Sequence, residues 1–169
     1  MRLGFLTLTE KGRADALLAG LAEEMRAAGR PLIAMVRAPT PAPRPCEMHL
    51  RLLPADRVVP ISQELGPGAD ACTLDAGALE QAVAETARAI AAAAPGTAVI
   101  LNKFGKQEAA GRGARALIGE ALARDLPVLI SAPPETRAAF DAFAAGCATE
   151  LPPDPAALAA FLAGQGPTG

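Results

Sequence analysis

Short apolar runs alternate along the chain with longer segments in which apolar and charged residues recur at helical spacing. Four apolar runs predict buried β-strands: residues 3–8, 31–36, 97–101 and 127–131. Four other segments predict amphipathic helices: residues 14–28, 114–124, 134–145 and 155–162. Asp75 is typical of an N-cap and predicts a further helix that runs to about Ala94. Because the strands are apolar throughout and alternate with helices, we expect an α/β fold with three layers and a mainly parallel sheet.

The region after the second predicted strand is less regular. The stretch "RAPTPAPRP" (37–45) predicts an extended surface connection, because each proline fixes φ and removes a backbone donor. The stretches "CEMHLRLLP" (46–54) and "RVVPISQEL" (57–65) predict two short strands that form a hairpin across Ala55 and Asp56. The closing "GQGPTG" predicts a flexible tail over 164–169, so residues 1–163 are expected to form a single domain.

Composition narrows the classes of partner. Aromatic residues make up 3% of the 169 residues, with no Trp or Tyr, so a base-stacking surface has little material. The formal net charge of -2 gives no basic footprint for a nucleic-acid backbone. We therefore expect no nucleic-acid partner, whereas a small ligand and a protein partner both remain open.

The cysteines and the apolar segments bear on the cellular compartment. Three cysteines, at positions 46, 72 and 147, lack a C-x-x-C pair, which suits a reducing cytoplasm. The first residues lack the long apolar region of a signal peptide. Charged residues at 80, 85 and 88 interrupt the Ala-rich segment, so we expect no membrane span. The sequence thus predicts a cytoplasmic protein.

The first strand-to-helix connection, "TLTEKGRA" (7–14), has the layout of a phosphate-binding loop but few of its residues. In the pattern G-x-x-x-x-G-K-[ST], only Gly12 matches. Arg13 stands in place of the lysine, Ala14 in place of the Mg²⁺-binding hydroxyl, and Glu10 adds a carboxylate. The stretch is either a degenerate Walker A loop or an ordinary turn. As a degenerate loop it predicts an anion contact from Lys11, Gly12 and Arg13 together with backbone N–H groups at the helix start.

The stretch "ILNKFGKQEAAGRGAR" (100–115) contains the only Asn and two of the three Lys of the chain. P-loop enzymes end the corresponding strand with an Asp that holds Mg²⁺, but this strand ends in Asn102 and Lys103. Since both residues follow a predicted strand, we expect their side chains to face a crevice rather than the core. The pattern predicts anion binding by Asn102, Lys103 and Lys106, with Gly105 allowing close backbone approach. The alternative is a solvated, charged loop, to which Arg112 and Arg115 would also belong.

Three stretches carry a resemblance to a known family: "PCEMHL" (45–50), "ISQELGPGADACTLD" (61–75) and "NKFGKQEAAGRG" (102–113). They resemble the domain-of-unknown-function family 2478, which is similar to the small P-loop nucleoside-triphosphatases and implies their five-strand P-loop fold. The strand-end motif of those enzymes is Asp-Glu-x-Gly-x-x-Glu. On that pattern Asn102 falls on the Asp, Lys103 on the first Glu, Gly105 on the Gly and Glu108 on the final Glu. Because the catalytic positions differ, the resemblance does not imply the activity.

These observations predict a protein that binds an oxyanion or a nucleotide phosphate without hydrolysing it. The family's association with molybdate transport implies a link to molybdate metabolism. Two alternatives stay open: an active nucleoside-triphosphatase with an atypical site, and a regulatory or scaffold partner protein. The sequence identifies no catalytic residue and leaves the cofactor unknown.

A metal site is a further alternative at Cys46, His49 and Cys72. Structural zinc sites usually draw on two ligand pairs, and this chain offers a single short C-x-x-H unit. We therefore expect these residues to be strand and core residues rather than zinc ligands.

Overall fold

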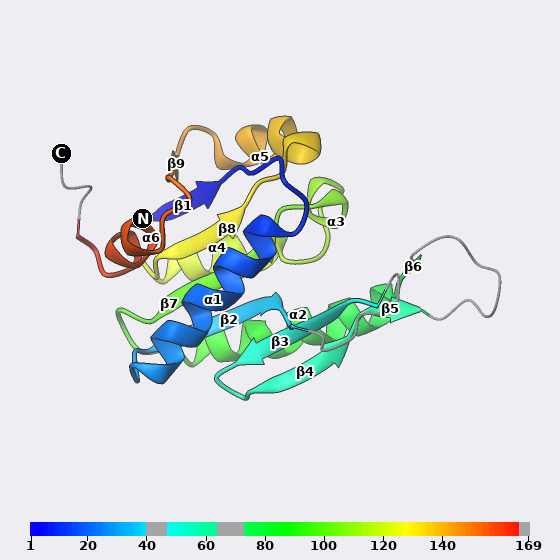
Figure 1. Ribbon diagram of the computed structural model, residues 1–169, viewed down its shortest axis with the longest axis horizontal. Helices are drawn as coiled ribbons and strands as arrows, with labels where there is room; N and C mark the ends of the chain where they lie inside the picture. The colour runs from blue at the N-terminus through cyan, green and yellow to red at the C-terminus, as the bar shows by residue number, and fades with distance from the viewer. Residues whose placement is uncertain (40–46, 64–72, 166–169) are drawn as a thin grey trace.

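The computed structural model describes residues 1–39, 47–63 and 73–165. Five parallel strands form the centre of one sheet, in the order β9 (Ala148–Glu150), β1 (Leu3–Leu6), β8 (Val128–Ser131), β7 (Ala98–Lys103) and β2 (Leu32–Arg37). An antiparallel hairpin extends this sheet beyond β2 through β3 (His49–Leu53) and β4 (Arg57–Pro60) (Figure 1). The short strands β5 (Ser62–Gln63) and β6 (Thr73–Leu74) pair separately.

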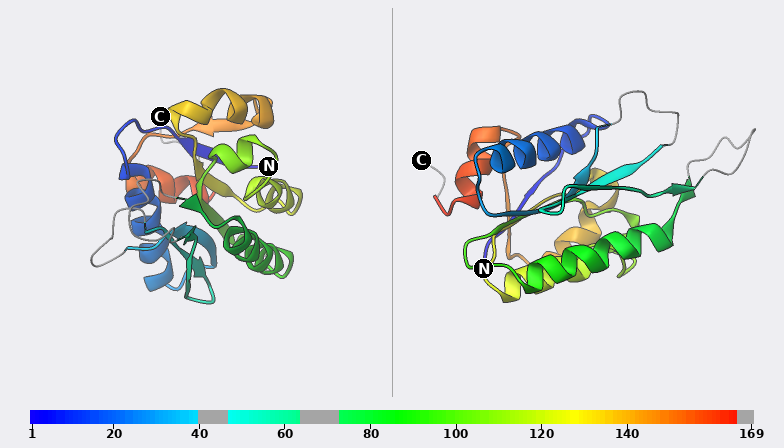
Figure 2. Two further views of the ribbon diagram at one scale, coloured as in Figure 1. Left: turned by 90° about the vertical axis from the view of Figure 1, so that its right-hand side faces the viewer. Right: turned by 90° about the horizontal axis from the view of Figure 1, so that it is seen from below.

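Helices cover both faces of the sheet. On one face lie α1 (Arg13–Ala27) and α6 (Pro155–Leu162), and on the other lie α2 (Ala76–Ala91), α4 (Arg115–Ala123) and α5 (Arg137–Ala144). The right-hand view of Figure 2 shows α1 and α2 on opposite sides of the strands. The predicted three-layer α/β fold with a mainly parallel sheet is therefore confirmed.

The two core layers follow the alternation of side chains along each strand. In β7, Ala98 and Ile100 pack in the layer that contains α1 and α6, while Val99 and Leu101 pack in the layer of α2, α4 and α5. Because buried side chains fill both faces, β1, β2, β7 and β8 are apolar over most of their length, which is the pattern that revealed them in the sequence.

The structure confirms the predicted N-cap at Asp75 and the predicted hairpin, and it adds elements that the pattern did not reveal. Asp75 Oδ1 accepts a hydrogen bond of 3.0 Å from the backbone N–H of Ala78 at the start of α2. The predicted helix at 134–145 begins with a 3-10 turn, Pro134–Thr136, before α5. The predicted loop after β7 contains a four-residue helix, α3 (Lys106–Ala109), and β9 was not predicted.

The carboxyl ends of β1, β2, β7 and β8 meet at one edge of the sheet, which we call the carboxyl edge. Because β3 is antiparallel to β2, its first residue, His49, lies at the same edge. Helix α1 follows β1 and helix α3 follows β7, so both helices begin near this edge. Ligands of open α/β sheets bind at such an edge, so this is where the candidate residues would act.

Candidate functional site

The connection from β1 to α1 brings an uncapped helix start to the carboxyl edge. Gly12 precedes α1 in the left-handed conformation, with φ of 78°, and no side chain caps the helix. Lys11, Gly12 and Arg13 are exposed, and Arg13 forms an exposed ion pair with Glu10 at 3.4 Å. Ala14 packs against the core layer of α1. This connection therefore offers free backbone donors and one lysine, but Ala14 supplies no hydroxyl at the position where a P-loop binds Mg²⁺.

A β-bulge interrupts β7 where the other half of the predicted site begins. The register between β7 and β8 shifts between two pairs, Ile100 with Leu129 and Lys103 with Ser131. Between these two pairs β7 has two residues, Leu101 and Asn102, where β8 has only Ile130. Leu101 packs in the core layer of α2, α4 and α5, and Lys103 resumes the pairing opposite Ser131.

Asn102 and Lys103 differ in exposure. They are the last two residues of β7 rather than residues that follow the strand, and Asn102 is only 9% exposed while Lys103 is exposed. Asn102 is thus buried at the end of β7, while Lys103 reaches solvent, and the prediction that both face a crevice stays a prediction. Asn102 Oδ1 is buried and has no hydrogen-bond partner among the described residues.

Ser131 fixes the backbone beside the bulge. Its hydroxyl donates a hydrogen bond of 2.7 Å to the carbonyl of Asn102, and its own carbonyl accepts one of 2.8 Å from the N–H of Phe104. These bonds pair the backbone carbonyl of Asn102 and the N–H of Phe104, but the side-chain amide oxygen of Asn102 has no partner among the described residues. Sequence reasoning did not single out Ser131, because a serine that ends an apolar strand carries no distinctive signal.

Glu108 closes the segment after β7 into a compact loop. One carboxylate oxygen accepts a hydrogen bond of 2.9 Å from the N–H of Gly105, and the other accepts one of 2.8 Å from the N–H of Ala114. Glu108 is 7% exposed, so its carboxylate is buried and its bonding capacity is used by the backbone. This acid, which falls on the final Glu of the nucleoside-triphosphatase motif, therefore holds the loop in shape.

The remaining basic residues of this loop divide into two groups. Lys103 and Lys106 are exposed and form no ion pair within the described residues. Arg112 donates to the Gln107 side chain at 3.0 Å, and Arg115 stacks over the ring of Phe143 with 5.0 Å to its centroid. The two lysines thus have no ionic partner among the described residues, so their charge is available to an anion.

The two halves of the predicted site share the carboxyl edge but are not adjacent. Strand β8 lies between β1 and β7. Their backbones are therefore about 10 Å apart, since neighbouring strands are spaced by about 4.8 Å. A ligand that contacts both halves would lie over the end of β8.

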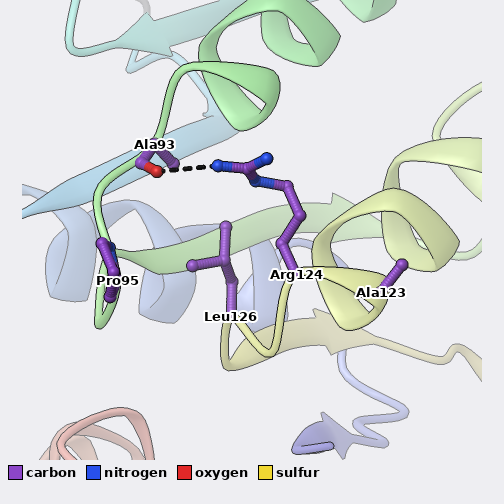
Figure 3. A pocket seen from close by; sticks show the side chains of 5 residues that line it. All are labelled: Ala93, Pro95, Ala123, Arg124 and Leu126. Atoms are coloured by element: carbon purple, nitrogen blue, oxygen red, sulfur yellow. Dashed lines mark hydrogen bonds between the residues drawn. The ribbon is translucent and has the colours of Figure 1, made fainter.

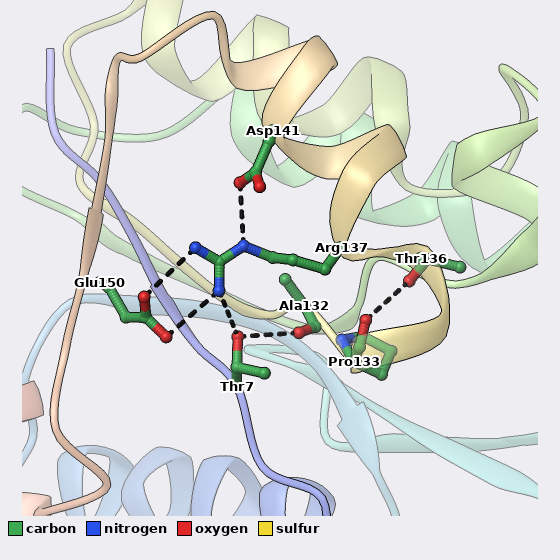
Figure 4. A network of polar contacts seen from close by, with 7 residues as sticks. All are labelled: Thr7, Ala132, Pro133, Thr136, Arg137, Asp141 and Glu150. Atoms are coloured by element: carbon green, nitrogen blue, oxygen red, sulfur yellow. Dashed lines mark hydrogen bonds and ion pairs between the residues drawn. The ribbon is translucent and has the colours of Figure 1, made fainter.

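A network centred on Arg137 lies at the same edge, beside β1 and β9 (Figure 4). Arg137 donates to Thr7 at 3.0 Å and forms ion pairs with Asp141 at 2.9 Å and Glu150 at 3.2 Å. Hydrogen bonds from Asp141 and then Glu150 raise the pKa of Arg137 above its ordinary value. The Thr7 hydroxyl donates to the Ala132 carbonyl at 3.0 Å, so the start of the β1–α1 connection is anchored.

Two surface depressions lie away from the predicted residues. One, of about 350 Å³, is lined by Ala93, Pro95, Ala123, Arg124 and Leu126, and Arg124 donates across it to the Ala93 carbonyl (Figure 3). The other, of about 390 Å³, lies beside the Arg137 network and includes Phe5 and Glu150. Neither contains a predicted anion-binding residue.

The metal alternative falls partly outside the described residues, because Cys46 and Cys72 belong to segments that the structure does not describe. His49 lies on β3, with its Nε2 3.5 Å from a carboxylate oxygen of Glu47. Within residues 1–39, 47–63 and 73–165, no group of three His, Cys, Asp or Glu side chains is placed to hold a metal ion. None of the helices in these ranges has the length and apolar character needed to cross a membrane.

The fold places the protein in a known structural class. A solved structure described as a human cancer-related nucleoside triphosphatase matches it with a TM-score of 0.58 and 17% sequence identity. The match covers 79% of this chain and 76% of that chain, so the fold is that of a P-loop nucleoside-triphosphatase relative. The family model "Protein of unknown function (DUF2478)" matches residues 3–161, and the chain belongs to that family.

A curated relative is also similar over most of this chain. The "Molybdenum import ATP-binding protein ModC 2" of Bradyrhizobium diazoefficiens is 37% identical over 139 residues. The matched region is 81% of this chain but only 15% of that protein. The similarity therefore concerns a small part of the relative.

Proposed function

We propose that the protein binds a tetrahedral oxyanion or the phosphate group of a nucleotide at the carboxyl edge, without hydrolysing it. The observation that carries this proposal is the bulge in β7, which sets the exposed ammonium of Lys103 beside the buried amide of Asn102. Both lie at the carboxyl edge, where α1 begins with uncapped N–H groups. A helix N-terminus attracts anions through its free donors and its dipole.

The proposed site consists of Asn102, Lys103, Gly105 and Lys106 from one side and Lys11, Gly12 and Arg13 from the other. Of the second group, Arg13 contributes least, since Glu10 neutralises it. Asp15, half-buried in the first turn of α1, is the acidic side chain that opposes an anion there. The lysines of the proposed site, Lys11, Lys103 and Lys106, outnumber this acid, so the local charge favours an anionic ligand.

We propose that the protein does not hydrolyse its ligand, because it lacks groups that a magnesium-dependent phosphoryl transfer requires. Asn102 replaces the strand-end carboxylate, and Ala14 replaces the loop hydroxyl. Glu108 is retained, but both its oxygens accept hydrogen bonds from the backbone. These replacements leave few groups to hold a metal ion or to orient an attacking water.

Two ligand classes are supported by different comparisons. The name of the matched relative couples molybdenum import with ATP binding, and molybdate is a tetrahedral oxyanion, which supports a link to molybdate metabolism. The fold shared with a nucleoside triphosphatase supports a nucleotide phosphate. Both classes present negatively charged oxygens, which is the chemistry that Lys103 and the start of α1 would recognise.

A thermal-shift screen tests this proposal. We expect the melting temperature to rise with at least one of molybdate, tungstate, sulfate, phosphate, ADP or ATP, because a ligand that binds only the folded state stabilises it by mass action. The rise should not require Mg²⁺. If none of these ligands shifts the melting temperature at millimolar concentration, the proposed binding function is wrong, and a regulatory or scaffold role without a small ligand is favoured.

An active nucleoside-triphosphatase is the second candidate, favoured by the shared fold. We predict no Mg²⁺-dependent release of phosphate from ATP or GTP, measured with a colorimetric phosphate assay. Turnover of about 1 per second or more that a chelator abolishes would contradict the non-hydrolysing proposal and establish this alternative.

A further inference from the structure

The turn that leads from β8 into α5, residues 132–137, lies between the two halves of the proposed site, because β8 separates β1 from β7 in the sheet. Its last two residues, Thr136 and Arg137, are each bonded to a different half. The Thr136 hydroxyl donates to the carbonyl of Phe104, which follows β7. The Arg137 guanidinium donates to the Thr7 hydroxyl at 3.0 Å, at the start of the β1–α1 connection.

Thr7 is the point at which the β1–α1 connection is held. In the described part of the chain, it is the side chain of residues 7–12 that hydrogen-bonds beyond this connection and α1. It donates to the Ala132 carbonyl at 3.0 Å and accepts from Arg137, whereas residues 9–12 are exposed. The position of Thr7 therefore sets where the chain turns toward Lys11 and Gly12.

Arg137 is itself held from three elements before any ligand arrives. It donates to Asp141 of α5 at 2.9 Å and to both carboxylate oxygens of Glu150 of β9 at 3.2 Å, and it lies over the ring of Phe5 of β1, 4.4 Å from the centroid. Figure 4 shows the guanidinium between Thr7, Asp141 and Glu150. A planar guanidinium has donors on several sides, so one side chain can join all of these partners.

Phenylalanine rings strengthen the connection between α5 and the two halves. Phe140 of α5 contacts Phe5 with 4.9 Å between ring centroids and Phe104 with 5.3 Å. Phe143, one turn further along α5, lies 5.4 Å from Phe104. Phe5, Phe104 and Phe140 are buried, and close-packed interiors transmit displacements rather than absorb them. A shift of α5 would therefore be felt at β1 and at the residue that follows β7.

We propose that the turn between β8 and α5 fixes the spacing of the two halves of the anion site, and that Arg137 is the positioning residue for the β1–α1 half. Arg137 acts through Thr7 and not by contact with the ligand, because its guanidinium already donates to Thr7, Asp141 and Glu150. A site whose halves are held in place loses less conformational entropy when a ligand spans them, so it binds more tightly. This inference rests on the proposed function.

Calorimetric titration with molybdate, inorganic phosphate and ADP tests the inference, without Mg²⁺ and at a temperature at which every variant is folded. Salt of about 0.15 M largely screens charges more than about 8 Å apart. Arg137→Met removes every donor of the guanidinium but keeps a long side chain. We expect it to weaken binding of the tightest of these probes roughly three- to tenfold, the equivalent of one hydrogen bond.

Thr7→Val removes the hydroxyl without changing the charge and should weaken binding by a similar factor. The double variant should bind no more weakly than the weaker of the two single variants, because both substitutions break the same link. Arg57→Met is the matched control. Arg57 is an ion-paired arginine of β4, at the opposite edge of the sheet, so this variant should bind like the parent.

Melting temperatures without ligand separate positioning from a purely structural role. A structural role predicts that Arg137→Met melts lower than the parent but binds the probe with unchanged affinity, and this result would overturn the inference. Losses that add in the double variant would overturn it too, because Arg137 would then act on the ligand through its charge. Both results leave the proposed function intact, whereas no binding of any probe by the parent would overturn the proposed function as well.

Discussion

At the scale of single residues, Gly113 determines whether the loop after β7 can close. It has φ of 59°, in the left-handed region, and a Cβ at this position would overlap Glu108 Oε1. Gly113→Ala should therefore strain the backbone and displace the carboxylate that holds the loop. We expect a loss of about 1–3 kcal/mol in the free energy of unfolding, measured by urea denaturation.

Gly119→Ala is the matched control for this prediction. Gly119 lies in α4, is exposed, and has open space where the methyl group of an alanine would lie. Alanine is favoured over glycine inside a helix by about 0.5–1 kcal/mol, so this variant should be slightly more stable than the parent. Equal stability of Gly113→Ala and the parent would show that Glu108 does not hold the loop as described.

The candidate residues illustrate what a sequence can reveal at this scale. Asn102 and Lys103 drew attention because Asn and Lys are scarce in the chain and stand at a strand end. The bulge beside Asn102 could not be predicted, because a bulge is a property of the pairing between two strands. The link from Arg137 to Thr7 likewise depends on neighbours that are distant in sequence.

At the scale of elements, an ion-pair cluster joins α1 to β3. Glu23 accepts hydrogen bonds from Arg26 at 2.6 Å and Arg51 at 2.8 Å, and Arg51 also pairs with Asp56 at 2.6 Å. The hydrogen bond from Arg26, followed by that from Arg51, lowers the pKa of Glu23 from 4.5 to about 2. The folded protein thus favours the ionised carboxylate.

This pKa predicts how stability depends on pH. The contribution of Glu23 should be fully present above pH 4.5 and be lost as the pH falls toward about 2, where the folded state also binds the proton. We expect Glu23→Gln to melt below the parent at pH 7 and the difference to shrink between pH 4.5 and 2. Melting temperatures recorded over this range at low salt provide the measurement.

Glu24→Gln is the control, because Glu24 is the exposed neighbour of Glu23 on α1 and forms no ion pair in the described part of the chain. This variant should melt like the parent at every pH. Since the cluster is partly exposed, added salt should reduce the effect of Glu23→Gln. A pH-independent difference for Glu23→Gln would contradict the assignment.

Long apolar or amphipathic segments were the elements that the sequence predicted well. Helices and strands with many buried residues, such as α2 and β7, follow from periodicity alone. Short elements were missed: β9 has exposed residues and depends on pairing with β1, and α3 depends on the buried Glu108. Their stability comes from tertiary contacts, so no local pattern marks them.

At the scale of the whole molecule, the sheet order decides what the carboxyl edge can bind. The two halves of the proposed site lie on either side of β8. A ligand that contacts both halves would therefore lie over the end of β8 and touch the β1–α1 connection and the loop after β7. The fold alone does not define the chemistry, because the same architecture supports different sites.

Calorimetric titration of phosphate, molybdate and ADP against the parent and three variants, without Mg²⁺, tests the central claim most directly. Lys103→Ala should weaken binding about 10- to 150-fold, since a hydrogen bond to a charged group contributes about 1.5–3 kcal/mol. Asn102→Asp combined with Lys103→Glu should abolish binding, because two carboxylates would repel the anion. Arg88→Ala, on the exposed side of α2, should bind like the parent. If the folded double variant binds as tightly as the parent, the end of β7 is not an anion site.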